Sequence, residues 1–140
     1  MCKLHNFCEL ADPLPLFTFT HPSPPPSLEE NARYSVKTFV SRGDATIHGV
    51  IGYFHCVLYR DVCMSIVPES HSEGMISWFP LYFPIRNPIP VCEGEKIEVH
   101  FWRCVSSTKI WYEWSISVND LAVTPIHNPN GRSYSIGLTI

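Results

Sequence analysis

The sequence lacks several features that would place it outside the cell or in a membrane. It has no Cys-x-x-Cys pair, no Asn-x-Ser/Thr acceptor and no apolar run near the roughly 20 residues of a membrane-spanning helix. Residues 1–20 also lack the basic start and long apolar core of a secretory signal. The six cysteines are therefore expected to be reduced intracellular thiols rather than disulfides or zinc ligands.

Catalytic motifs are equally scarce. There is no glycine-rich phosphate loop and no nucleophile elbow. His48, His55 and Cys56 cannot all share one face of a strand, because only alternate residues do. The acidic pairs lie in turn-like contexts, where solvated charge is the ordinary role: Glu29 and Glu30, Glu69 and Glu73, and Glu93 and Glu95. Taken alone, the sequence predicts a domain that binds a partner and catalyses nothing.

A basic stripe is missing as well. Ten basic residues against 13 acidic ones give a net charge of −3, which excludes a general nucleic-acid binder. Acidic loops attract lysine- and arginine-rich tails, so this balance favours a basic protein as the partner.

No segment shows a sustained helical period, and strand-like runs follow one another at short spacing. This pattern predicts an all-β fold, a single antiparallel barrel or sandwich-like domain over residues 1–140. The clearest prediction is a hairpin of 96–103 and 110–118 with one wet face. The other predicted strands are 16–21, 34–40, 46–60, 61–68, 78–85 and 133–138, with a weak one at 4–10.

Glycine and proline modify these predictions. Gly49 and Gly52 inside 46–60 predict a bulge or a sharp bend. Pro80 and Pro84 make 78–85 an edge or irregular strand. The proline-rich run 22–27 predicts a surface loop, a plain spacer or, alternatively, a ligand for an SH3 domain.

A loop at 68–80 leads through Gly74 to an aromatic sequence, Ser77, Trp78 and Phe79. Trp78 stands where the loop is about to become a strand, so the strand can hold it while it reaches a ligand. A flat indole there suits a planar cation such as guanidinium. The local sequence by itself favours an ordinary core tryptophan instead.

Several runs of the sequence resemble one family closely, and together they cover nearly the whole chain. They are Leu4-His5-Asn6-Phe7, Phe17-Thr18-Phe19 with His21-Pro22, Gly52-Tyr53-Phe54 with Val57-Leu58-Tyr59, 68–79, Phe101-Trp102-Arg103-Cys104, Trp111-Tyr112-Glu113-Trp114, and Ile126-His127-Asn128-Pro129 with Gly131-Arg132-Ser133-Tyr134. This resembles the C-terminal β-barrel domain of the protein arginine N-methyltransferase 5 family, which makes symmetric dimethylarginine.

The resemblance implies a larger enzyme. The family combines a TIM barrel, a Rossmann-like domain that binds S-adenosylmethionine, and this barrel. The catalytic glutamates and the cofactor site belong to the Rossmann-like domain, so this chain alone is expected to bind no cofactor and to contain no catalytic residue. Substrates would be arginine/glycine-rich proteins and histones, in the cytoplasm and the nucleus. A homo-oligomer is expected, with a WD-repeat partner on the N-terminal domain.

The resemblance also gives substrate-binding residues. Trp78 matches the tryptophan that walls the channel for the target arginine, Phe79 the residue whose backbone lines the same pocket, and Ser77 the serine before them. Ile76 departs from the family, which usually has phenylalanine there, and this change is expected to loosen the pocket.

Two alternatives stay open at this point. One is a stand-alone, non-catalytic barrel that binds arginine-rich proteins or the catalytic subunit. The other is a lectin-type sandwich in which Trp78 stacks on a sugar, which leaves the other matching runs unexplained.

Overall fold

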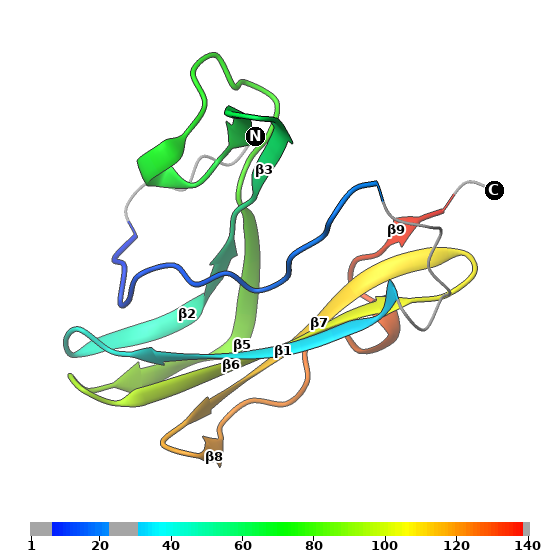
Figure 1. Cartoon of the computed structure of the whole chain (residues 1–140). Coiled ribbons are helices and arrows are strands. Elements are labelled where there is room, and N and C mark those ends of the chain that lie inside the picture. Colours follow the sequence, from blue (N-terminus) through cyan, green and yellow to red (C-terminus); the bar gives the residue numbers. More distant parts are fainter. Residues whose placement is uncertain (1–6, 23–30, 139–140) are drawn as a thin grey trace. The chain divides into compact units, whose positions relative to one another are not determined.

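The structure, a computed structural model, describes residues 7–22 and 31–138, apart from the side chain of Ala122. Its strands are β1 (Arg33–Val40), β2 (Ala45–Gly52), β3 (His55–Tyr59), β4 (Val62–Ser65), β5 (Leu81–Val91), β6 (Lys96–Val105), β7 (Lys109–Val118), β8 (Leu121–Ala122) and β9 (Ile136–Gly137). Two short 3₁₀ turns, η1 (Pro68–Ser70) and η2 (Pro129–Gly131), complete it (Figure 1). The predicted all-β class is confirmed. No helix in these ranges is long and apolar enough to cross a membrane.

The chain divides into two compact units. The hairpin unit holds residues 7–8 and 48–84, and the sheet unit holds 9–22, 31–47 and 85–138 of the described residues. Strands β2 and β5 pair with each other. Each belongs to both units, because the divisions between residues 47 and 48 and between 84 and 85 fall within them.

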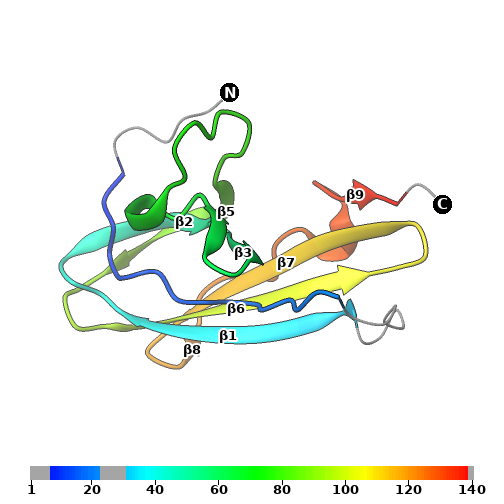
Figure 2. The ribbon, with the colours of Figure 1, turned by 45° about the horizontal axis from the view of Figure 1, so that its top comes forward.

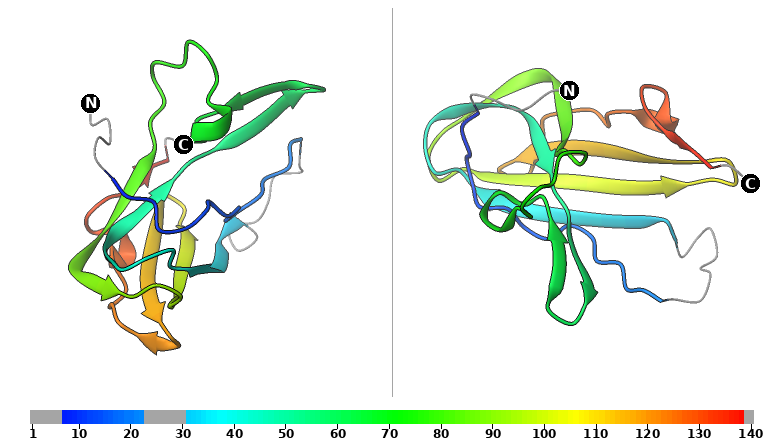
Figure 3. Two further views of the ribbon diagram at one scale, coloured as in Figure 1. Left: turned by 90° about the vertical axis from the view of Figure 1, so that its left-hand side faces the viewer. Right: turned by 90° about the horizontal axis from the view of Figure 1, so that it is seen from above.

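The sheet unit is built on three long antiparallel strands in the order β1, β6, β7, which lie side by side in Figures 1 and 3. Strands β8 and β9 pair with opposite ends of β7. Val99 lies opposite Ile116 and Phe101 opposite Trp114, and all four side chains are buried. Full burial of one such side chain contributes about 1.5–3 kcal/mol. The predicted hairpin of 96–103 and 110–118 is confirmed, with slightly longer strands.

Strand β1 confirms the predicted 34–40, but the predicted strand at 16–21 is wrong. The segment 9–22 runs extended beside β1 (Figure 2). Arg42 N donates to Leu10 O at 3.0 Å, and Arg33 Nη1 donates to Thr18 O at 3.1 Å, so the two run antiparallel. Pro13 and Pro15 have no backbone N–H to offer, which works against a regular ladder here.

Two other predictions touch undescribed residues. The weak strand at 4–10 is absent from 7–10, and 4–6 lie outside the described residues. Of the proline-rich loop 22–27, residues 23–27 lie outside them too.

In the hairpin unit, the predicted strand 46–60 is divided at Tyr53 and Phe54 into β2 and β3. β3 pairs with β4 in an antiparallel hairpin whose register shifts between Val57 and Tyr59. Gly49 marks a close backbone approach: a Cβ atom there would lie 2.4 Å from Phe83 O. The glycine is therefore needed for packing against β5.

Strand β5 begins at Leu81, three residues later than predicted, and continues to Val91. It pairs with β2 alone among the described strands, as its prolines led us to expect. The described strands form one five-stranded and two two-stranded sheets, with no closed barrel. Pro84, Pro88 and Pro90 cannot donate to a further ladder partner, which limits closure at this strand.

Candidate functional site

Trp78 lies in the loop between η1 and β5, as predicted. Its side chain is 57% exposed, so the ordinary expectation of a core tryptophan does not hold. The ring of Phe54 packs against the indole in a T-shaped contact. The two ring planes meet at 81° and their centroids lie 5.7 Å apart. No cation of the described residues is recorded over the Trp78 ring. The Trp78 indole thus packs on Phe54 while more than half of its surface is exposed.

The start of this loop is braced by Ser65, which is 1% exposed at the end of β4. Its Oγ accepts a hydrogen bond from Val67 N at 3.1 Å and shares one with Ser70 Oγ at 2.9 Å. Ser65 N donates to Ser72 Oγ at 3.0 Å, and Ser72 N donates back to Ser65 O at 2.9 Å. The sequence reasoning missed this serine, although a serine that ends an apolar strand just before Pro68 was a visible signal.

The remaining loop residues are placed differently. Gly74 has φ +72°, a conformation that favours glycine, and it turns the chain. Ser77 is exposed and Phe79 is half-buried. Ile76, where the resemblance leads us to expect phenylalanine, is 77% exposed and lies at the surface beside the predicted site.

The Trp78 indole is an exposed aromatic surface of this loop. An exposed indole attracts a planar cation by about 0.5–2 kcal/mol, depending on desolvation. Within the described part of the chain, no three His, Cys, Asp or Glu side chains lie close enough to hold a metal ion. The exposed Trp78 ring is thus a surface of the kind that suits a planar cation such as guanidinium.

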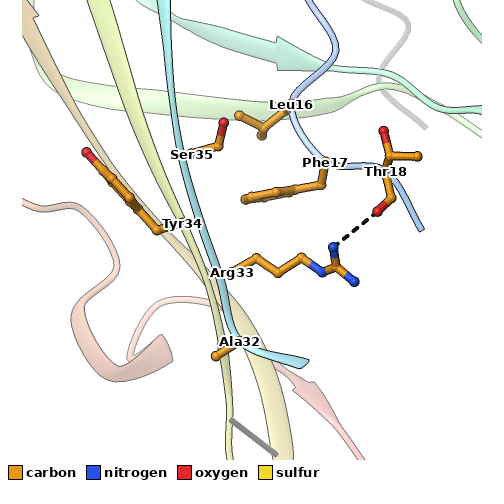
Figure 4. Close-up of a pocket in the computed structure, with 7 residues that line it drawn as sticks. All are labelled: Leu16, Phe17, Thr18, Ala32, Arg33, Tyr34 and Ser35. Carbon is orange, nitrogen blue, oxygen red and sulfur yellow. Dashed lines mark hydrogen bonds between the residues drawn. The ribbon is translucent and has the colours of Figure 1, made fainter. Parts of the chain in front are cut away.

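The sheet unit contains contacts of this cation–π type between its own residues. The Arg33 guanidinium lies 4.4 Å from the centroid of the Phe19 ring, and that of Arg103 lies 5.4 Å from it. Arg33 lines an open hollow between β1 and the segment 16–18. Figure 4 shows its side chain beside Phe17, with the hydrogen bond that it donates to Thr18 O. The Arg33 Nε atom is buried without a hydrogen-bond partner in the described residues. The hollow already contains its own cation, so it is a poor site for a second one.

Comparison with known proteins gives the family. A family profile described as "PRMT5 oligomerisation domain" matches residues 1–136. Protein arginine N-methyltransferase 5 of Xenopus laevis is 51% identical over 136 residues, 97% of this chain and 21% of that protein. The Oryza sativa subsp. indica protein of the same name is 47% identical, with the same coverage. Protein arginine N-methyltransferase skb1 of Schizosaccharomyces pombe is 32% identical, over 88% of this chain and 22% of that protein.

The profile covers nearly the whole chain, whereas the chain spans about a fifth of the length of these relatives. The resemblance seen in the sequence motifs is thus confirmed at the level of the family. The chain belongs to the PRMT5 oligomerisation domain family.

Proposed function

We propose that this chain is part of a protein arginine N-methyltransferase and that its Trp78 loop contacts the target arginine. The complete enzyme would transfer a methyl group from S-adenosylmethionine to arginines of glycine/arginine-rich proteins and histones, with symmetric dimethylarginine as the product. The observation that carries the proposal is the exposed Trp78 indole, held edge-on by Phe54 beside a loop braced at Ser65.

The part played by this chain is orientation. When a guanidinium stacks on the indole, its plane is held parallel to the ring, so the guanidinium can no longer tumble freely. Its reacting nitrogen can then be oriented toward a methyl donor. Phe79 would line the same channel through its backbone, and Ser77 would contact the substrate on the other side of Trp78 in the sequence. The carboxylates that polarise the guanidinium would come from another part of the enzyme.

The two hollows that border β1 do not fit S-adenosylmethionine. A nucleoside-bearing cofactor is usually held by a glycine-rich turn with an acidic residue on the ribose. Neither of these two hollows is lined by a glycine-rich turn or by an acidic residue. When bound elsewhere in the enzyme, the cofactor supplies the methyl group.

The second role is assembly. Oligomerisation follows from the family, and we propose that the β3–β4 hairpin contributes a contact, because Val57, Leu58 and Tyr59 are each about 60% exposed (61%, 59% and 65%). Exposed apolar clusters of this kind mark interaction sites. A homo-oligomer, a WD-repeat partner on the N-terminal domain, and residence in cytoplasm and nucleus complete the proposal.

The test is a series of substitutions at Trp78 in the native protein that contains this chain. Trp78→Ala should sharply lower methyl transfer to an arginine peptide, by roughly tenfold or more, because both orientation and cation–π attraction are lost. Trp78→Phe keeps an aromatic face and should retain more activity. Leu81→Ala, at the start of β5 and 51% exposed, is the control. Equal activity of the Ala and Phe variants would contradict a guanidinium wall.

A further inference from the structure

Two arginines face each other at one end of the sheet unit. Arg33 of β1 lies directly opposite Arg103 of β6 in the strand register. Like charges in opposite positions of neighbouring strands destabilise a sheet, so this pairing by itself works against the fold. Both guanidiniums lie near the same ring, that of Phe19, and are therefore on the same side of the sheet. A pairing that breaks a local rule of this kind is typical of a functional position.

The positive charge of this pair is not balanced by a carboxylate in the part of the chain that the structure describes. Neither Arg33 nor Arg103 takes part in an ion pair there. Lys37, four positions after Arg33 and therefore on the same face of β1, forms none either. The whole chain has a net charge of −3, so this end of the sheet is a positive surface on an acidic chain.

The two arginines use only part of their hydrogen-bonding capacity, and only on neutral acceptors. Arg33 Nη1 donates to Thr18 O at 3.1 Å. Arg103 Nη1 donates to Asn31 Oδ1 at 2.8 Å and also to Asn31 O. The Nη2 groups of both arginines form no hydrogen bond within residues 7–22 and 31–138. The contacts that fix the two guanidiniums therefore leave their charge and their Nη2 donors for an anion.

The pair is also ordered before any ligand binds, and it is accessible. The contacts with Phe19, at 4.4 Å for Arg33 and 5.4 Å for Arg103, hold the guanidiniums without neutralising them. Arg33 lines the open hollow of about 500 Å³ together with two hydroxyl-bearing residues, Thr18 and Ser35 (Figure 4). An ordered cation beside hydroxyl groups is a favourable environment for an oxyanion, since less entropy is lost on binding.

We propose that Arg33 and Arg103 together bind a carboxylate side chain in an acidic segment of a partner protein. The carboxylate would accept hydrogen bonds from the two Nη2 groups, and its charge would relieve the repulsion between the arginines. A protein is the occupant that the comparisons favour, because the family is described as an oligomerisation domain. Lys37 would extend the positive surface along β1 to a second acidic residue. The inference does not rest on Trp78, which lies in the hairpin unit.

The experiment measures the affinity of a fluorescent hexaglutamate peptide for the native protein that contains this chain, at low ionic strength. Arg33→Gln and Arg103→Gln should each weaken binding about three- to tenfold, because each removes a charge-assisted hydrogen bond. Arg60→Gln is the matched control and should bind like the parent. Arg60 also lies over an aromatic ring, 5.1 Å from the Tyr59 centroid, but in the hairpin unit and without an arginine opposite.

A second variant and a second readout guard against misfolding. Arg33→Lys keeps the charge but loses the planar fork, so its affinity should lie between those of the parent and Arg33→Gln. Hexaglutamate should also raise the thermal midpoint of the parent more than that of either glutamine variant. Trp78→Ala should bind the peptide like the parent, so this proposal and the Trp78 proposal fail separately.

Three results would overturn the proposal. One is unchanged hexaglutamate affinity in both glutamine variants, with circular dichroism that matches the parent protein. Another is an equal loss in Arg60→Gln, which would show general attraction to basic side chains. The third is a parent protein that binds inorganic phosphate at this pair but not hexaglutamate, because the site would then hold a small anion and not a protein segment.

Discussion

At the scale of single residues, buried polar side chains fix the loops of this protein. Asn128 is 7% exposed and has φ 53°. Its Nδ2 donates to Tyr112 O at 2.9 Å and Tyr134 O at 2.8 Å, while Oδ1 accepts from Ser133 N at 2.9 Å and Tyr134 N at 3.1 Å. One side chain therefore joins the turn at 127–131 to β7 and to the segment that follows.

Replacing this asparagine should be costly. Asn128→Ala removes these four hydrogen bonds and leaves backbone groups without partners, so we expect a loss of about 2–4 kcal/mol in the free energy of unfolding. Asn130→Ala is the matched control, because Asn130 also has a positive φ of 57° but is exposed. Chemical denaturation of both variants checks the difference. Similar losses would mean that backbone strain, and not the hydrogen bonds, dominates.

Cys104 offers a test that depends on pH. Burial raises the pKa of its thiol, and the negative charge of Glu113 raises it further. Only the thiolate reacts with iodoacetamide, so a raised pKa lowers the reactive fraction at a given pH until the pH exceeds it. We expect Cys104 to alkylate about tenfold more slowly than the exposed Cys63 near pH 8, with its rate still rising above that pH. Mass spectrometry of timed samples gives both rates, and equal rates would contradict the burial.

At the scale of elements, the contact of β2 with β5 depends on a missing side chain. A Cβ atom at Gly49 would meet Phe83 O at 2.4 Å and the Tyr82 ring at 2.7 Å. Gly49→Ala should therefore lower the free energy of unfolding by about 1–3 kcal/mol, because backbone must move. Gly43→Ala is the control, since no atom lies within 4 Å of its Cβ position. Thermal unfolding of the two variants should differ clearly, and equal midpoints would contradict this packing.

The elements also show what the sequence could and could not predict. Strands β6 and β7 were predictable because apolar residues recur at every second position, at 97, 99 and 101 in β6 and at 110, 112, 114, 116 and 118 in β7. The segment 16–21 alternates too, but a short pattern does not specify a hydrogen-bonding partner, and prolines flank it. The exposure of Trp78 was not readable from the local sequence, which favours a core tryptophan. The family resemblance gives Trp78 a substrate-binding role, and that role stays a prediction.

At the scale of the whole molecule, this chain should act only as part of a larger assembly. We expect the isolated 140-residue chain to show no measurable methyl transfer, because the proposed cofactor site and the proposed paired carboxylates belong to another part of the enzyme. A radiolabelled methyl-transfer assay with an arginine peptide checks this. Robust activity of the isolated chain would show that the missing groups are not essential.

The most direct test of the account compares two quantities in one variant of the native protein. Trp78→Ala should sharply lower methyl transfer while it leaves the dissociation constant for S-adenosylmethionine nearly unchanged, because the proposed cofactor site lies outside this chain. Calorimetric titration of the cofactor beside the transfer assay gives both values. An equal loss of cofactor binding and methyl transfer would contradict the assignment of Trp78 to the target arginine.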